Sequence, residues 1–442
     1  MSVFRDYKII KDPLHGYIKV FPHERCIVDS PPFQRLRRLK QLPAAQYVYP
    51  GAVHTRFTHS LGVMHVAGLF AEHLYSKLGI DRAELERLVA IARLLGLLHD
   101  IGHGPFSHTF EDHVLSKYGT NHEIVGGRLV REHQDLSSCF DRIEKELGVS
   151  AKAMGGMIEA PSAEVWPLTS RVSGGVTERS LYYIIKGAYS ADLIDYILRD
   201  SLYTGANYGL GLDWVRLAYN SRLVKDRVVL EYKAKDVLDH LLIARLYMFK
   251  TVYFHKTARA FDKVIGDLLE RADPVVNFGE AVDDLNKYVN LDDESVLGHP
   301  EVRALSEANY LLNRVVPYKM VYESLQPIEG SLSTLIGFAK DVIETTLVGR
   351  LRASGADVGD SAVFIDTPKL PTNPMFEETE VDLVMPDGVL VSRPVRDTTA
   401  GLMPKEIAFF RVYLHTKYSK YLELARTVAT SIFKGRELRS FY

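Results

Sequence analysis

One helix constrains the fold of this chain more than any other stretch. The window 83–98 carries apolar residues at the i, i+3, i+4, i+7 spacing of an amphipathic helix, and further apolar positions widen the stripe: Leu85, Leu88, Val89, Ala92 and Leu95, with Ile91, Leu94 and Leu98. A helix that is apolar around so much of its circumference is expected at the centre of a domain. It delivers His99 and Asp100 at its buried end, and the glycine-containing turn after it carries His103 and His108.

Composition and charge exclude several classes of protein. The 442 residues suffice for about two or three domains with a large core, and 46% apolar and 25% charged residues are ordinary for a soluble globular protein. A formal net charge of −2 supplies no strong field for nucleic acid or for an anionic membrane. No apolar run approaches the ~18 residues of a membrane span. We therefore expect no membrane association and no stable nucleic-acid partner.

The cysteines and the N-terminus bear on the compartment. The chain has two cysteines, Cys26 and Cys139, and no Cys-x-x-Cys. We expect both to be buried, unpaired thiols in a reducing compartment. The first residues contain no apolar stretch of signal-peptide length. These features together predict a cytoplasmic protein.

Helical periodicity dominates most of the chain, so we expect a mainly α fold. Helices are predicted over 33–42, 58–77, 83–98, 121–135, 180–203, 236–270 and 302–325. Residues 1–30 predict a small β hairpin, 150–180 a loop, and 271–300 a connection or a mobile insert.

The pattern changes after about residue 355. Strands are predicted at 363–366, 381–385 and 410–414, with a hairpin turn at Asp387-Gly388 and a last helix over 418–434. We therefore expect a helical core with a short N-terminal β hairpin (1–270), a connecting segment with helices (271–350) and a smaller C-terminal α+β part (351–442).

Four side chains are candidate metal ligands: His59, His99, Asp100 and Asp192. Asp192 opens a helical stripe that also holds Asp195, Tyr196, Arg199 and Asp200. An exposed amphipathic helix is the alternative explanation, but three carboxylates gathered with a tyrosine and an arginine are more typical of a polar cleft. Two histidines and two aspartates suit Mn, Fe, Ni, Co or Zn more than an all-oxygen Mg site.

A hydrolase built on such a site also needs a proton shuttle and positive charge. Candidates for proton transfer are His103, His108 and the neighbouring His122 and Glu123, since a glutamate beside or facing a histidine can hold its tautomer. Arg56 and Arg245 can meet phosphate charge with bidentate contacts. The motifs of P-loop NTPases, serine hydrolases and zincins do not occur in the sequence.

The order of these ligands resembles that of the HD-domain metal-dependent phosphohydrolases. The similarity is closest to their deoxynucleoside triphosphate (dNTP) triphosphohydrolase branch, whose metazoan member carries an extra sterile-alpha-motif module that we do not find in these 442 residues. Eight ordered blocks carry the resemblance: DPLHG (12–16), FQRLRRLKQL (33–42), PGAVHTRFTHSLGV (50–63), LLHDIGHGPFSH (97–108), NHE (121–123), DLIDYILRD (192–200), RLYMFKTVYFHK (245–256) and RVYLHTKYSKYLELAR (411–426).

The resemblance implies a mostly α-helical fold and hydrolysis of a dNTP to a deoxynucleoside and inorganic triphosphate, with attack at the α-phosphorus. It implies a divalent transition metal held by His59, His99, Asp100 and Asp192, with Mg accompanying the substrate. His122 corresponds to the catalytic histidine, Glu123 to its partner, and His103 to a residue near the metal-bound water. The implied substrate contacts are Arg56 and His108 at the phosphates, Gln41 and Leu42 near sugar and base, and Tyr196, Asp200, Arg245 and Tyr253, with Asp200 towards the sugar 3′-hydroxyl.

The resemblance also bears on regulation. Asp29, Gln34 and Arg37 match a guanine-reading allosteric pocket of the metazoan member, which implies a nucleotide activator and a homo-oligomer, a dimer or a tetramer. The alternative is that these residues only shape a helix surface. The chain departs from the family pattern where Leu193 replaces a phosphate-binding lysine, Phe249 replaces a histidine and Glu111 replaces an aspartate.

Three functions therefore stay open from the sequence. The first is a metal-dependent dNTP triphosphohydrolase, favoured by the complete ligand set. The second is a nucleotide phosphomonoesterase of the same class, because Leu193 removes a cation and fewer cations favour fewer phosphates. The third is a nucleotide-binding regulatory module with little turnover, based on Asp29, Gln34 and Arg37.

Overall fold

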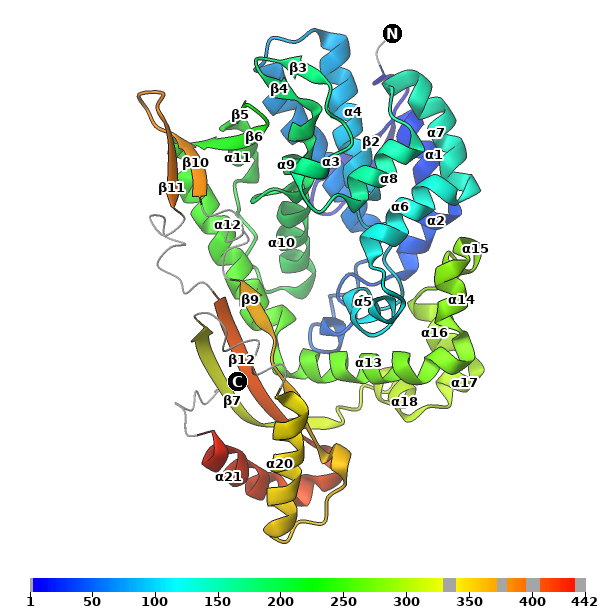
Figure 1. The fold of residues 1–442 in the computed structure, drawn as a ribbon, viewed down its shortest axis with the longest axis vertical. Coiled ribbons are helices and arrows are strands. Elements are labelled where there is room, and N and C mark those ends of the chain that lie inside the picture. Colours follow the sequence, from blue (N-terminus) through cyan, green and yellow to red (C-terminus); the bar gives the residue numbers. More distant parts are fainter. Residues whose placement is uncertain (1–2, 329–338, 372–379, 395–405, 434–442) are drawn as a thin grey trace.

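The computed structural model describes residues 3–328, 339–371, 380–394 and 406–433 (Figure 1). Its centre is an antiparallel pair of long helices, α3 (Arg56–Ser76) and α4 (Arg82–Leu98). Their backbones approach closely, since a Cβ built on Gly96 would come within 3.0 Å of the α3 backbone at Val63. Every residue of α4 from Leu88 to Leu98 is buried, which confirms the predicted central helix.

Further helices surround this pair and confirm the mainly α fold. Before and after it lie α1 (Pro22–Val28), α2 (Pro31–Gln34), α5 (His108–His113), α6 (His122–Glu132), α7 (Gln134–Leu147), α8 (Ala151–Glu159), α9 (Leu181–Lys186), α10 (Ala191–Thr204), α11 (Trp214–Tyr219), α12 (Lys235–Met248) and α13 (Lys256–Val276). Short helices follow: α14 (Phe278–Asp283), α15 (Leu285–Tyr288), α16 (Asp293–Gly298), α17 (Pro300–Arg303) and α18 (Ser306–Leu312).

The strands form small sheets. The predicted N-terminal hairpin is β1 (Lys8–Asp12) paired with β2 (Gly16–Val20), and a second two-stranded sheet pairs β3 (Arg171–Ser173) with β4 (Val176–Thr177). A four-stranded sheet has the order β11 (Leu390–Pro394), β10 (Glu380–Val384), β6 (Arg227–Glu231) and β5 (Ser221–Val224). Gly388 has φ +83° between β10 and β11, where a hairpin turn was predicted.

The C-terminal α+β part has its own hydrophobic core. Its sheet has the order β7 (Tyr318–Ile328), β12 (Glu406–His415) and β8 (Val363–Asp366), with β9 (Lys369–Pro371) also on β12. Helices α20 (Lys340–Ala353) and α21 (Leu422–Ile432) contribute apolar side chains to this core, and Figure 1 shows them beside the sheet. Because β7 already belongs to the sheet, pairing in this part begins well before residue 351; the sequence-based limits at 270 and 350 stay a prediction.

The predicted helix over 33–42 is wrong. The chain forms only α2 and a 3₁₀ turn at Arg35–Arg38, and Leu39 is extended with φ −105° and ψ 112°. The reason is a β-type contact: Lys40 pairs with Thr55, and the amide of Arg56 donates to the carbonyl of Leu39 at 3.0 Å. This contact brings residues 40–42 beside the start of α3.

Several other predictions need correction. The 150–180 segment is not only a loop, since it contains α8, β3 and β4. The predicted helix over 302–325 is interrupted, because α18 ends within it and β7 begins within it. Breaks divide the predicted helices over 180–203 and 236–270. The 271–300 segment is a run of short helices whose side chains Phe278, Tyr288 and Val296 are fully buried in the main core. The last helix is confirmed as α21, and residue 434 lies outside the described residues.

The expectation of unpaired cysteines is also wrong. Cys26 of α1 and Cys139 of α7 form a disulfide with a Cα–Cα distance of 5.8 Å across a sequence separation of 113 residues. The two helices pack on one another, so residues far apart in sequence meet there. Within the described part of the chain, we find no helix with the length and apolar character needed to cross a membrane.

Candidate metal centre and active site

Three helices bring the four candidate ligands together. His59 lies in the first turn of α3, His99 and Asp100 follow the end of α4, and Asp192 lies in the first turn of α10. Nε2 of His59 is 3.0 Å from Oδ1 of Asp192 and 3.7 Å from Oδ2 of Asp100. Nε2 of His99 is 3.6 Å from Oδ1 of Asp192 and 3.3 Å from Oδ1 of Asp100.

The second nitrogen of each histidine is fixed by a neighbouring oxygen. Nδ1 of His59 lies 2.8 Å from Oδ2 of Asp195, and Nδ1 of His99 lies 2.8 Å from the carbonyl of Gly96. Both rings therefore turn Nε2 towards the carboxylates of Asp100 and Asp192. Histidine ligands of metals are commonly oriented in this way by an outer carboxylate or carbonyl.

A buried ion-pair network holds Asp195 in place. Arg199 Nε donates to Oδ2 of Asp195 at 2.9 Å, and Arg199 Nη1 donates to Asp12 at 2.9 Å. His15 Nε2 lies 2.6 Å from Oδ1 of Asp195. Asp12 and His15 belong to the DPLHG block, so that block holds in place a residue that orients His59, one of the candidate ligands.

The ligand set fits a divalent metal. His99 Nε2 is buried and has no hydrogen-bond partner among the described residues, although it faces two carboxylates. Burial alone lowers the pKa of His59, but hydrogen bonds to Asp192 and Asp195 outweigh it and raise the pKa to about 10. The site thus favours a cation between these side chains, and two imidazoles with two carboxylates suit a transition metal.

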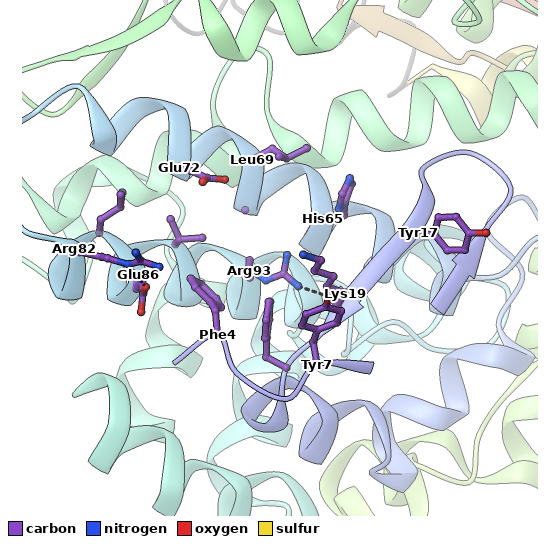
Figure 2. Close-up of a pocket in the computed structure, with 14 residues that line it drawn as sticks. Phe4, Tyr7, Tyr17, Lys19, His65, Leu69, Glu72, Arg82, Glu86 and Arg93 are labelled. Atoms are coloured by element: carbon purple, nitrogen blue, oxygen red, sulfur yellow. Dashed lines mark hydrogen bonds and ion pairs between the residues drawn. The ribbon is translucent and has the colours of Figure 1, made fainter. Parts of the chain in front are cut away.

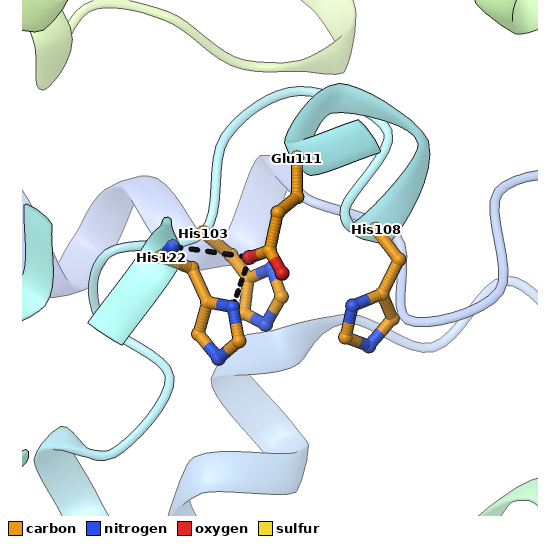
Figure 3. Close-up of side chains that lie close together, drawn as sticks. All are labelled: His103, His108, Glu111 and His122. Atoms are coloured by element: carbon orange, nitrogen blue, oxygen red, sulfur yellow. Dashed lines mark hydrogen bonds and ion pairs between the residues drawn. The ribbon is translucent and has the colours of Figure 1, made fainter. Parts of the chain in front are cut away.

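A second group of titratable side chains lies next to this centre: His103, His108, Glu111 and His122 (Figure 3). Nε2 of His103 is 3.4 Å from Oδ1 of Asp100, which joins the two groups. Glu111 accepts a short hydrogen bond from Nδ1 of His122 and another, at 3.0 Å, from the backbone amide of His122.

The ring geometry argues against a metal ion inside this second group. The His103 and His122 rings are stacked, with centroids 3.9 Å apart and an interplanar angle of 13°. An imidazole binds a metal in its own plane at about 2.1 Å, so two stacked rings cannot both direct a lone pair at one ion. Burial, with the nearby charge of Arg56, lowers the pKa of His108 to about 4, so this ring is neutral at pH 7. The group therefore suits hydrogen bonding and proton transfer.

The predicted pairing of His122 with Glu123 is not what the structure shows. Glu123 points to Lys186, whose Nζ donates to it at 2.6 Å and also to the carbonyls of Ile158 and Ala160. Glu111, one helical turn after His108 on α5, takes the place beside His122. The sequence carried one signal for a carboxylate such as Glu111 at this place. His122 is the first residue of α6, and a negative charge is favourable at the N-terminus of a helix.

The predicted sugar-side residues also come together. Asp200 accepts a hydrogen bond from the hydroxyl of Tyr253 at 2.7 Å, and the Tyr196 and Tyr253 ring centroids are 6.5 Å apart. A π-helical turn, Phe249–Tyr253, follows α12 and brings Tyr253 to this position. Sequence reasoning missed His54, whose Nε2 lies 2.7 Å from the other oxygen of Asp200.

Two further arginines reach this region. Arg56 donates a short hydrogen bond to Asp100 and another, at 2.8 Å, to the hydroxyl of Ser107. The guanidinium of Arg245 lies 4.8 Å from the ring centroid of Phe249 and interacts with Tyr196. Arg56 thus orients Asp100, a candidate metal ligand, as well as adding positive charge.

Gln41 and Leu42 lie beside the start of α3. The amide of Gln41 donates to the carbonyl of His54 at 3.0 Å, and its side-chain Oε1 is buried without a hydrogen-bond partner among the described residues. Leu42 is half-buried and packs against the main core. The β-type contact described above therefore holds both residues next to His54 and Arg56.

The three candidate allosteric residues lie elsewhere. Asp29 ends α1, Gln34 Nε2 donates to the carbonyl of Val28 at 2.7 Å, and Arg37 Nε donates to Oε1 of Gln34 at 2.8 Å. Arg37 also lies over the ring of Phe57 at 3.6 Å. These contacts are local, and a nucleotide-binding role for the three residues stays a prediction.

A cavity of about 650 Å³ lies between the N-terminal residues and helices α3 and α4 (Figure 2). None of the predicted site residues is among the described residues that line it. Its arginines already have acidic partners: Arg93 Nε donates to Glu24 at 2.5 Å, and Arg82 Nε donates to Glu86 at 2.9 Å. The cavity is therefore separate from the candidate active site. Both arginines that line it are paired with a glutamate, so neither is available to bind an anionic ligand.

Comparison with known proteins agrees with this geometry. The family model described as HD domain matches residues 56–168, and the one described as HD associated region matches residues 212–390. A Dictyostelium discoideum protein named deoxynucleoside triphosphate triphosphohydrolase SAMHD1 homolog is 31% identical over 296 residues, which are 65% of this chain and 53% of that protein. The chain spans about half the length of the curated relatives of that name.

Other relatives are covered more completely. An uncharacterized protein of Methanocaldococcus jannaschii is 30% identical over 429 residues, which are 94% of this chain and 81% of that protein. The crystal structure of a phosphohydrolase from Bacteroides thetaiotaomicron matches with a TM-score of 0.68 at 25% identity, covering 93% of this chain and all of that one. The chain therefore belongs to the HD-domain phosphohydrolase family, in a branch similar to the deoxynucleoside triphosphate triphosphohydrolases.

Proposed function

We propose that this protein hydrolyses a dNTP to a deoxynucleoside and inorganic triphosphate. The observation that carries the proposal is the convergence of four candidate metal ligands with a histidine held by a carboxylate, His122 with Glu111. Relatives that are named deoxynucleoside triphosphate triphosphohydrolases support the same reaction.

His59, His99, Asp100 and Asp192 would hold one divalent ion. When bound, such an ion polarises a phosphoryl oxygen and lowers the pKa of a water molecule. Arg56 fixes one oxygen of Asp100, and Asp195 fixes the ring of His59, so the ligands are oriented before any substrate arrives.

His122 is the proposed general acid or base. Burial alone raises the pKa of Glu111, but the hydrogen bond from His122 outweighs it and lowers the pKa to about 2. Glu111 therefore stays ionised, keeps a proton on Nδ1 of His122 and stabilises the imidazolium form. This leaves Nε2 of His122 to exchange a proton with the attacking water or the leaving oxygen. We propose that the ring of His103 and the neutral ring of His108 hydrogen-bond phosphoryl oxygens.

Asp200 and Tyr253 form the proposed sugar site. Hydrogen bonds from Tyr253 and His54 fix the two oxygens of the Asp200 carboxylate, so it can accept a hydrogen bond from the 3′-hydroxyl in a defined orientation. Gln41 and Leu42 are the proposed neighbours of sugar and base, and Arg245 and Tyr196 of the phosphates.

A second candidate, a nucleotide phosphomonoesterase, is favoured by one observation. Leu193, where the family has a phosphate-binding lysine, is 5% exposed and packs in the main core. The position therefore contributes no charge to a triphosphate. The two candidates give different products, which makes them separable in one assay.

The test is to incubate a dNTP with protein reconstituted with Mn²⁺ and to identify the products by ³¹P NMR. The Mn²⁺ is removed by chelation after the reaction, before the spectrum is recorded. Inorganic triphosphate as the first product supports the proposal, and with H₂¹⁸O the label is expected in the triphosphate, as attack at the α-phosphorus requires. Stepwise release of orthophosphate, or activity on monophosphates alone, would select the phosphomonoesterase. Binding of nucleotide without turnover, across several metals, would select a regulatory module.

We also propose that the protein works in the cytoplasm as a dimer or tetramer, with a nucleotide activator at Asp29, Gln34 and Arg37. Light scattering with and without a guanine nucleotide tests the assembly. An unchanged mass and an unchanged rate would exclude a nucleotide activator at these residues.

A further inference from the structure

The turn that carries the histidines of the second group has an unusual backbone. Phe106 and Ser107 have φ values of +59° and +58°, and both lie between His103 and His108. Residues other than glycine rarely adopt positive φ, and they keep it only where surrounding contacts hold the backbone. The positions of His103 and His108 therefore depend on what holds this turn.

The main contact comes from far along the chain. Asp293, the first residue of α16, is buried, and its Oδ1 accepts a hydrogen bond from the amide of Phe106 at 2.7 Å. Its Oδ2 accepts another from the amide of Lys40 at 2.9 Å. The hydroxyl of Ser107 donates to the carbonyl of Lys40 at 2.8 Å. One carboxylate thus joins the strained turn to the segment that carries Gln41.

The same region makes a second contact with the turn. The hydroxyl of Tyr288, on α15, donates to the carbonyl of Gly102 at 2.7 Å, in the buried interior. Arg35 joins both sides, since it donates to the carbonyl of Ile101 at 2.8 Å and to that of Leu291 at 3.2 Å. Residues 285–293 therefore hold the turn at both ends.

We propose that Asp293 is a positioning residue for the active site: its carboxylate holds the Phe106–Ser107 turn so that His103 and His108 face the metal centre. Tyr288 supports the same turn from its other end. The inference rests on the proposed function for the meaning of a change in rate, but the restraint on the turn is measurable without it.

The variants are Asp293→Asn and Tyr288→Phe, with Asp284→Asn as the matched control. Asparagine keeps the shape of Asp293 but turns an NH₂ group against one of the two amides. Tyr288→Phe removes only a hydroxyl. Asp284 caps α15 in the same segment by accepting from the amide of Asn286 at 2.9 Å, and that contact is local to the helix end.

Three measurements are made on each full-length variant: hydrogen exchange of peptides spanning 99–110, metal content, and kcat and KM separately. We expect faster exchange in 99–110 for Asp293→Asn and, less, for Tyr288→Phe, with unchanged metal content. A displacement of about 1 Å in reacting groups lowers turnover by roughly 10²-fold, so we expect kcat to fall by up to this factor in Asp293→Asn while KM changes little. The control should match the wild type in all three.

Each outcome decides the proposal. Unchanged exchange in 99–110 of Asp293→Asn would overturn the restraint itself, whatever the activity. Faster exchange with an unchanged kcat would overturn the positioning role. A variant that loses exchange protection throughout the chain is replaced by Tyr288→Phe, to which the same criteria apply. If the wild type turns over no phosphate ester, the proposed function fails, and the exchange data still show separately whether Asp293 holds the turn.

Discussion

Glu111→Gln is the sharpest test of the proposed proton transfer, because the chain provides its own control in Glu123→Gln. Glu111 accepts hydrogen bonds from two nitrogens of His122, whereas Glu123 pairs with Lys186. Both bonds end on the same oxygen of Glu111, Oε2, so glutamine at 111 keeps an acceptor oxygen for both but loses the negative charge that stabilises an imidazolium.

The size of the effect follows from the strength of the bond that changes. A hydrogen bond to a charged group contributes about 1.5–3 kcal/mol and a neutral one about 0.5–1.5 kcal/mol, so the substitution removes about 1–2 kcal/mol. If this loss falls on the transition state, kcat decreases roughly 5- to 30-fold. Metal content should not change, because Glu111 is not a ligand of the metal centre.

The assay is steady-state turnover of a dNTP between pH 5 and 9. The pKa of Glu111, about 2, lies below this range, so the carboxylate itself contributes no acid limb in the wild type. In Glu111→Gln kcat should fall across this whole range, because a neutral amide replaces the carboxylate beside His122. Glu123→Gln should stay within about threefold of the wild type, since Lys186 keeps two carbonyl acceptors. A larger loss in Glu123→Gln than in Glu111→Gln would refute this reasoning.

Four further predictions use other parts of the molecule. His122→Ala should retain the metal and lose about 10²–10⁴-fold in kcat, and loss of metal on elemental analysis would contradict a role in proton transfer. Reducing the Cys26–Cys139 disulfide, which spans 113 residues, should lower the free energy of unfolding by about 2–5 kcal/mol in denaturant titrations while the rate at 25 °C persists. Tyr253→Phe removes the hydroxyl that donates to Asp200, so KM for a dNTP should rise several-fold with unchanged metal content; an unchanged KM would exclude the sugar role. Burial, with His15 and Arg93 nearby, lowers the pKa of His65 from 6.5 to about 4. As the pH falls, the unfolded chain therefore binds this proton before the folded chain does. The free energy of unfolding should decrease by up to about 3 kcal/mol between pH 6.5 and pH 4. His65→Leu should lose part of that pH dependence, and an equal slope in both proteins would contradict it.

Local patterns predicted the parts of the fold that local forces determine. The spacing of Leu88, Leu95 and their neighbours predicted α4 because one apolar stripe at the helical period has few other ways to be buried. The helix over 33–42 failed because Lys40 finds a partner strand in Thr55, a contact that no periodicity encodes. The disulfide escaped prediction for the same reason, since helix packing alone decides which cysteines meet.

In the candidate site, too, the sequence predicted the residues that lie in motifs but not those that depend on tertiary contacts. The four candidate metal ligands follow from the order of motifs, and the structure brings them within a few ångströms of one another. Glu111, His54 and Asp293 act only through tertiary contacts with His122, Asp200 and Phe106. Adjacency in sequence favoured Glu123 as the partner of His122, but successive helical residues point in different directions, so the carboxylate next in sequence faces Lys186 instead.

The central claim is that His59, His99, Asp100 and Asp192 form one divalent-metal centre. Its most direct test is the metal content of the wild type and of Asp192→Ala, measured by elemental analysis after loading with Mn²⁺ and removal of free ion. Asp213→Ala, which removes the same charge from the N-terminus of α11, is the control. We expect about one ion per chain in the wild type and the control, and little or none in Asp192→Ala. Equal metal content in all three proteins would contradict it.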